Sequence, residues 1–136
     1  MAMNSTRKVK VSCGSRDFFS YVTDIRNFGR FVPVSMKEGW MAENDSCRFI
    51  LPGMGEIKLS ILRKEPFTDV LYSGNALSRI NFSLDLKIED KDNDTSEVEL
   101  QLKAEADPLT MIVASPGIER FLDMLAGEME KFKDWK

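Results

Sequence analysis

The chain has 136 residues and a formal net charge of −3, so its length predicts one domain and its charge argues against a general phosphate-binding surface. No apolar run is long enough to cross a bilayer, and the segment 1–8 has no apolar signal-peptide core, which predicts a cytoplasmic protein. The sequence contains no histidine, which removes the commonest general base and the commonest metal ligand.

The chain up to Pro33 predicts a strand followed by two short helices. Apolar and polar residues alternate over 7–13, as they do in a half-buried strand. Helical spacing of apolar residues then begins after Ser15, which we expect as an N-cap, and Thr23 or Asp24 is expected to cap the second helix. Pro33 is expected to end that helix, because the residue before a proline is pushed out of the helical region.

Period-two alternation continues from residue 34 to residue 106 and predicts a run of antiparallel strands. We expect these strands over 34–44, 46–51, 56–64, 69–76, 81–90 and 97–106. Glu38 shares the phase of the apolar residues in the first of them. Either it is a charge that faces inward, or Gly39 marks a β-bulge.

One long helix is expected from Pro108 to Trp135, with Asp107 as its N-cap and a break near Pro116. Its apolar residues trace one face and are Ile118, Phe121, Leu122, Leu125, Met129 and Phe132. Gly127 lies mid-helix, and of two explanations we favour close approach to the sheet over a flexible hinge. A long amphipathic helix needs a large apolar surface, which a curved antiparallel sheet supplies.

The predicted fold class is therefore α+β. A curved antiparallel sheet of six to seven strands surrounds a long C-terminal helix, and two short helices follow the first strand. We expect one such domain over residues 1–136.

Three segments carry a resemblance to a known family. They are DFFSYVTDIRNFGRFVP (17–33), FILPGMGEIKLSI (49–61) and PLTMIVASPGIERFLDMLAGEMEKF (108–132). Their order and spacing resemble the START-like superfamily, also called the birch-allergen-like or SRPBCC helix-grip fold. The resemblance implies a cavity between the sheet and the long helix. Members include lipid and sterol carriers, hormone receptors, polyketide cyclases, coenzyme Q-binding proteins and chaperone activators, so the fold is predicted more sharply than the function.

The first hypothesis is therefore a binding or transport protein for a small hydrophobic ligand, such as a lipid, an isoprenoid or a polyketide-like molecule. The candidate ligand-binding residues are Phe28, Phe31, Phe49, Met54, Leu59, Ile61, Tyr72, Phe82, Leu84, Leu86, Leu100, Leu102, Ile118, Phe121, Leu122 and Leu125. Two interpretations stay open. These side chains fill the core completely, or the helix stands off the sheet and leaves an apolar pocket, which phenylalanine and methionine would suit.

A second hypothesis is an enzyme similar to polyketide cyclases or dehydratases, although we favour a chain that is not an enzyme. Such an enzyme would need polar groups in the interior, and the candidates are Glu38, Arg63, Tyr72, Arg79 and Asn81. In the absence of histidine the base would be a carboxylate, and Glu38 has the strand phase that permits it. Tyr72 is the second catalytic candidate. A third hypothesis is a protein-interaction role.

Two other patterns are explained better by turns than by binding sites. Residues 53–55 with Lys58 contain two glycines, but strands flank them where a phosphate loop has a helix. Asp90, Asp92 and Asp94 alternate, but they lack the glycine and the closing glutamate of a calcium loop.

Cys13 and Cys47 fall on apolar phases of predicted strands and form neither a metal motif nor a redox motif. We expect buried free thiols. We also expect no metal, no cofactor, no nucleic-acid partner and no integral membrane segment.

Overall fold

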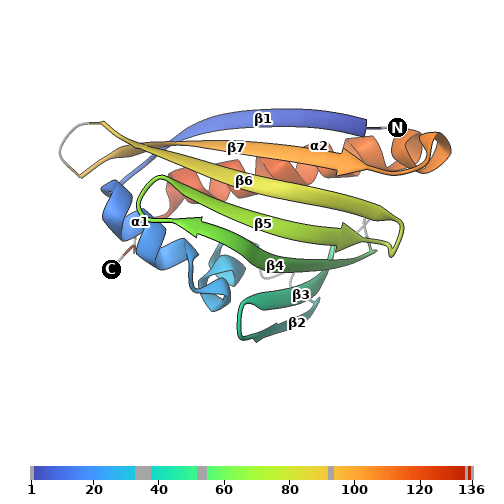
Figure 1. Cartoon of the computed structure of the whole chain (residues 1–136), viewed down its shortest axis with the longest axis horizontal. Coiled ribbons are helices and arrows are strands. Elements are labelled where there is room, and N and C mark those ends of the chain that lie inside the picture. Colours follow the sequence, from blue (N-terminus) through green and yellow to red (C-terminus); the bar gives the residue numbers. More distant parts are fainter. Residues whose placement is uncertain (1, 33–37, 52–54, 92–93, 134, 136) are drawn as a thin grey trace.

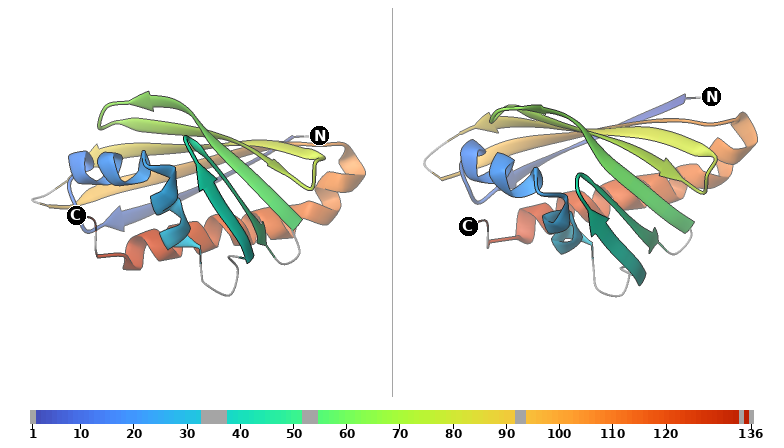
Figure 2. Two further views of the ribbon diagram at one scale, coloured as in Figure 1. Left: turned by 90° about the horizontal axis from the view of Figure 1, so that it is seen from below. Right: turned by 60° about the horizontal axis from the view of Figure 1, so that its bottom comes forward.

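The computed structural model describes residues 2–32, 38–51, 55–91, 94–133 and 135. Within these residues seven antiparallel strands form one curved sheet in the order β1-β7-β6-β5-β4-β3-β2. A long helix runs across the concave side of this sheet, and two short helices follow the first strand (Figures 1 and 2). The predicted helix-grip arrangement is confirmed.

The strands are β1 (Ala2–Val11), β2 (Glu38–Glu43), β3 (Ser46–Leu51), β4 (Gly55–Glu65), β5 (Asp69–Ala76), β6 (Ile80–Asp90) and β7 (Ser96–Glu105). The helices are α1 (Ser15–Val22), the 3-10 helix η1 (Ile25–Phe31) and α2 (Pro108–Lys131). β3 and β5 match the predicted ranges. β1 begins earlier than predicted, at Ala2, because it pairs with β7 along its whole length.

The core lies between the concave face of the sheet and the helices. On β6 and β7 the directly opposed pairs Leu84–Leu102 and Leu86–Leu100 are all buried. The residues between them in sequence point to the outer face, as the period of a strand requires. The alternation read from the sequence therefore placed the correct side chains in the core.

β2 contains the irregularity expected near Gly39. Glu38 pairs with Ile50, the register then shifts before Met41, and Gly39 has a φ of 70°. The β-bulge alternative is confirmed for the backbone. The side chain of Glu38, the predicted start of this strand at residue 34 and the role of Pro33 lie outside the described residues.

The caps of the short helices were predicted only in part. Ser15 is not the N-cap of α1; Gly14 takes that position, and Ser15 is the first helical residue. The carboxylate of Asp90, at the end of β6, accepts bonds of 2.8 Å from both the Ser15 N–H and the Ser15 hydroxyl, which lowers the pKa of Asp90. At η1, Asp24 is the N-cap as expected and accepts from the Arg26 N–H at 3.1 Å.

The predicted break in α2 at Pro116 is wrong, because the helix continues through that residue. A proline inside a helix removes the bond to the carbonyl four residues earlier, here that of Ile112. Pro116 and Ile112 both lie on the exposed side of α2, so water can take the place of the missing donor.

The helix also ends earlier than predicted, at Lys131 rather than near Trp135. Trp135 turns back and is buried, and its indole N–H donates to the Phe132 carbonyl at 3.0 Å. Its ring packs against Phe18 and Tyr21 of α1, with centroids 5.2 and 5.3 Å apart. This aromatic cluster fixes the C-terminal end of α2 to the short helices.

Gly127 does not mark close approach to the sheet. A Cβ atom built on it would meet nothing within 4 Å, so the favoured explanation for this glycine is wrong. Among the described residues, no helix is both long and apolar enough to cross a membrane.

Candidate functional site: the space between the sheet and the long helix

An ion-pair cluster fixes α2 along β1 at one edge of the sheet. Arg7 lies on the inner face of β1, and its guanidinium meets Glu119 at 2.7 Å and Asp123 at 2.5 Å. The hydrogen bonds to these two carboxylates raise the pKa of Arg7 and lower that of Glu119. Towards the other edge, α2 meets the sheet through longer side chains. The ring centroids of Phe121 and of Phe49 on β3 are 6.4 Å apart.

Fourteen of the sixteen predicted ligand-binding residues are buried in this space. They are Phe28, Phe31, Phe49, Leu59, Tyr72, Phe82, Leu84, Leu86, Leu100, Leu102, Ile118, Phe121, Leu122 and Leu125. Ile61 is only half-buried because the register of β4 and β5 shifts beside it, and Met54 lies outside the described residues. Contact of these residues with a ligand stays a prediction.

Burial in this space is complete in the middle of the sheet and slightly lower towards the ends. Leu84, Leu100 and Leu125 have an exposed fraction of 0%, so no water-sized space adjoins them. Phe82 and Ala114, nearer the start of α2, keep 8% and 6%. Ile88 and Ala126, towards the other end, keep 7% each, so the core is filled around the middle of the sheet and small exposed fractions remain at both ends.

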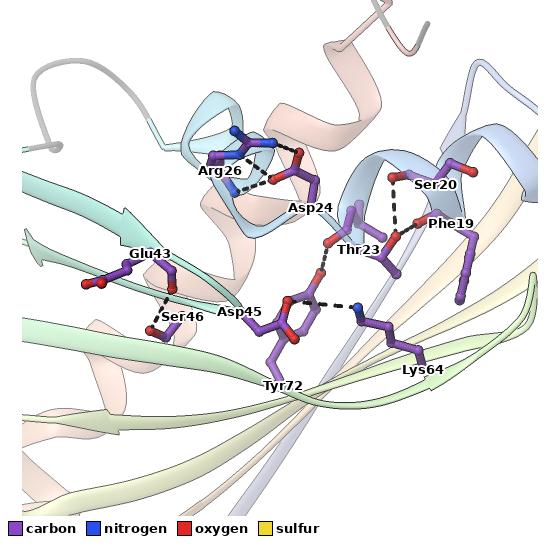
Figure 3. A network of polar contacts seen from close by, with 11 residues as sticks. Phe19, Ser20, Thr23, Asp24, Arg26, Glu43, Asp45, Ser46, Lys64 and Tyr72 are labelled. Carbon is purple, nitrogen blue, oxygen red and sulfur yellow. Dashed lines mark hydrogen bonds and ion pairs between the residues drawn. The ribbon is translucent and has the colours of Figure 1, made fainter.

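Tyr72, one of the two catalytic candidates, is committed to a structural hydrogen bond. Its hydroxyl donates to the carbonyl of Val22, at the end of α1, at 2.8 Å. Figure 3 shows its side chain reaching the segment between the short helices, beside Thr23 and Asp24. Complete burial raises the pKa of Tyr72, so the phenol stays neutral. Its proton is already donated to the Val22 carbonyl. The other candidate, Glu38, has no described side chain.

The remaining polar candidates do not line the interior, so that part of the enzyme hypothesis is wrong. Arg63 is exposed and pairs with Asp69 at 2.8 Å. Asn81 is exposed and accepts from the side chain of Asn75 at 3.1 Å. Arg79 is exposed in the turn between β5 and β6.

A pair of carboxylates lies on the outer face of the sheet. Asp69 of β5 and Asp85 of β6 are diagonal neighbours there, and the Oδ1 atom of each is buried with no donor among the described residues. Burial, and then the adjacent Asp69, raise the pKa of Asp85 to about 6. The pair faces away from α2, so it belongs to the stability of the sheet rather than to the interior site.

The other patterns noted in the sequence have structural roles wherever the structure describes their residues. Cys13 and Cys47 are buried and neither forms a disulfide, as expected, and burial raises the pKa of Cys47 to about 12. Asp90 caps α1, and Lys58 lies 3.6 Å from Glu56. Residues 53, 54 and 92 are outside the described chain, and the described residues contain no cluster of three or more potential metal ligands.

An open groove of about 470 Å³ lies at the N-terminal end of α2, within the usual size range of small-molecule sites. It is lined by Leu77, Arg79, Leu109, Thr110, Val113 and Ala114. Figure 2 shows the turn between β5 and β6 beside the first turns of α2. The sequence interpretation named Arg79 for another role and missed the other five. The available signal was the uncharged stretch 108–118 at the start of a helix.

The turn beside this groove has an unusual backbone. Leu77 and Ser78 both have a φ of 57°, and the Arg79 N–H donates to the Ala76 carbonyl at 3.1 Å, which closes a tight hairpin. Turns of this kind normally carry glycine or asparagine, because other residues are strained there. The Leu77 side chain packs against Gly55, where a Cβ would collide with it. The turn therefore holds a leucine in a costly conformation at the edge of the groove.

The fold, rather than the sequence, connects this chain to known proteins. No family model and no curated protein matches the sequence. Truncated norcoclaurine synthase from Thalictrum flavum matches with a TM-score of 0.72 at 10% identity, over 98% of this chain and 96% of that chain. The same protein in complex with dopamine and hydroxybenzaldehyde gives 0.70 at 9% identity, over 98% and 90%.

A START superfamily protein from Mycobacterium smegmatis matches with a TM-score of 0.64 at 13% identity, over 96% of this chain and 99% of that chain. At these identities the likeness concerns the fold alone.

Proposed function

The chain has the START-like, birch-allergen-like helix-grip fold, and on this premise we propose that it binds a small hydrophobic ligand between the sheet and α2. A lipid, an isoprenoid or a polyketide-like molecule has the required chemistry. The observation that carries the proposal is the groove of about 470 Å³ at the N-terminal end of α2, four of whose six lining residues are apolar.

The apolar face of α2 continues inward from the groove. Ala114, Ile118 and Phe121 follow each other at helical spacing on the side that faces the sheet. Phe121 meets Phe82 of β6, with ring centroids 6.3 Å apart. The floor of the groove is therefore continuous with the packed aliphatic and aromatic core.

The polar groups near the groove suit orientation of a ligand better than catalysis. The Arg79 guanidinium is exposed at its edge and can bind a carboxylate or phosphate head group. Asp107, next to the groove, is engaged as the cap of α2 and accepts from the Thr110 N–H at 3.0 Å. The proposed ligand therefore has an apolar body and, where it carries charge, an anionic end.

Titration with Nile red, an uncharged apolar fluorophore, tests this proposal. We expect saturable binding near one to one. Ala114→Trp places a ring at the floor of the groove and should abolish binding, and circular dichroism checks that the fold persists at this nearly buried position. Ala42→Trp is the matched control, because Ala42 lines a separate hollow of about 390 Å³ between β2, β3 and β4. It should bind as the wild type does.

Absence of saturable binding in the wild-type protein would refute the proposal. Binding that survives Ala114→Trp and is lost in Ala42→Trp would move the ligand to the other hollow.

A further inference from the structure

The first half of α2 is apolar on its exposed side as well as on its buried side. No charged residue occurs in the stretch 108–118. Leu109, Ile112 and Val113 have exposed fractions of 73%, 63% and 77%. Pro116 is exposed as well, so these four residues follow each other at i, i+3, i+4 and i+7 and form one stripe, which we call the apolar stripe. Helices that pack against each other bury stripes of this spacing.

Charged residues of opposite sign lie at the two ends of the apolar stripe. Asp107 is the N-cap of α2, and its hydrogen bonds with Thr110 lower the pKa of this carboxyl, so it is ionised. Arg120 is exposed four residues after Pro116, on the same side of the helix. A helix that lies on lipid is normally rich in lysine and arginine on its polar side. One acid and one base at opposite ends favour instead an occupant that carries the same two charges in reverse order.

We propose that the apolar stripe packs against the same stripe of a second copy of this chain, in a dimer with two-fold symmetry. A two-fold axis beside Ile112 and Val113 makes the two α2 helices antiparallel. Leu109 of one copy then lies opposite Pro116 of the other, because both residues are about equally far along the helix from the axis. No charge is buried in such a contact, since the stripe is uncharged over its whole length.

The charges at the ends of the stripe agree with this arrangement. Asp107 and Arg120 are also about equally far from the axis, in opposite directions along α2. Each end of the contact therefore brings Asp107 of one copy towards Arg120 of the other, and symmetry makes this contact twice. The stripe is thus complementary to itself both in its apolar pattern and in its charge.

The size of the apolar surface fits an interface of this kind. Leu77, in the strained turn, is 44% exposed and lines the same groove as Leu109 and Val113. Together with Ile112 these side chains expose about 450 Å², which is at the upper end for one patch on a monomer. A standard interface buries about 800 Å² on each partner, and about 55–65% of that area is apolar, or roughly 450–500 Å². The exposed apolar surface supplies that share, and the charged ends belong to the polar rim.

Sedimentation equilibrium of the full chain over a range of concentrations tests this inference. We expect a dimer with a Kd in the micromolar range. Ile112→Glu places two carboxylates beside the two-fold axis and should raise the Kd at least about tenfold. Ile112 is exposed and does not line the groove, so the fold and the binding of Nile red should persist. Leu62→Glu on β4 is the matched control, since Leu62 is 67% exposed but lies outside the stripe, and it should dimerise as the wild type does.

Arg120→Glu tests the antiparallel orientation independently. It turns both acid–base contacts into contacts between like charges, so the Kd should rise about threefold or more at low ionic strength, and less when salt screens the charges. An unchanged Kd would overturn the antiparallel arrangement.

A wild-type protein that stays monomeric at every concentration would overturn the inference, as would an Ile112→Glu variant that dimerises like the wild type. A monomer that binds phosphatidylcholine vesicles, and loses them in Ile112→Glu, would assign the stripe to a bilayer and overturn the dimer. The dimer does not depend on the proposed ligand, so absence of Nile red binding in the wild type would refute the ligand site alone.

Discussion

Replacing Asp85 by asparagine should make the protein more stable above pH 6 and leave it unchanged near pH 4. Asp85 and Asp69 are diagonal neighbours on the outer face of the sheet, and the pKa of Asp85 is raised from 3.8 to about 6 by burial and by Asp69. When Asp85 is protonated it can donate to Asp69. When it is ionised, two carboxylates face each other. Asparagine keeps the shape and supplies a permanent donor.

The sign follows from proton binding. The folded protein holds the Asp85 proton more tightly than the unfolded chain, so this stabilisation is complete below about pH 4 and is lost as the pH rises through 6. A pKa shift of this size corresponds to at most about 3 kcal/mol in the free energy of unfolding. Asp85 remains partly in water, and Arg63 and Lys87 oppose the shift, so we expect about 1 kcal/mol after screening.

Urea denaturation at pH 4, 6 and 7.5 measures this effect. The free energy of unfolding of Asp85→Asn should exceed that of the wild type by about 1 kcal/mol at pH 7.5 and equal it at pH 4. Asp45→Asn, in an exposed turn with only a 3.9 Å contact to Lys64, should follow the wild type at every pH. A variant that is less stable than the wild type at pH 7.5, or a difference that does not change with pH, would refute the argument.

Three further substitutions test the packing of α2, each by its urea midpoint. Phe121→Ala removes a ring between Phe49 and Phe82 and should cost about 3–5 kcal/mol, so an unchanged midpoint would mean that α2 does not pack here. Leu100→Trp should cost about 1–3 kcal/mol because no free space adjoins Leu100, and tolerance of the ring would reveal a pocket there. Gly127→Ala should add up to about 1 kcal/mol, since nothing would meet the new methyl group; destabilisation would point to the hinge explanation.

The placement of Arg79 shows where pattern analysis stops. It was named as a candidate interior polar group, although it lies between the strands expected over 69–76 and 81–90, and the structure puts it in the β5–β6 turn at the edge of the groove. Leu77 was not singled out because the turn that holds it has none of the usual glycine or asparagine signals. Both residues acquire their meaning only beside Leu109 and Val113, which lie far along the chain.

The sequence by itself determined the order of elements and the two apolar faces. Strand alternation and helical spacing are local, so each stretch reports its own buried side, as the paired leucines of β6 and β7 confirm. It also carried the uncharged stretch that begins α2, although the sequence interpretation did not single it out.

Only the tertiary structure decided how those faces meet. The ion pairs of Arg7 bring α2 close to β1, and the side chains between α2 and the middle strands fill the core there. Pro116 stays helical because it lies on the side of α2 that faces water. The groove depends on the distance between a hairpin turn and a helix about thirty residues further along. Nothing local specifies such a distance, because it results from the packing of the whole sheet against α2.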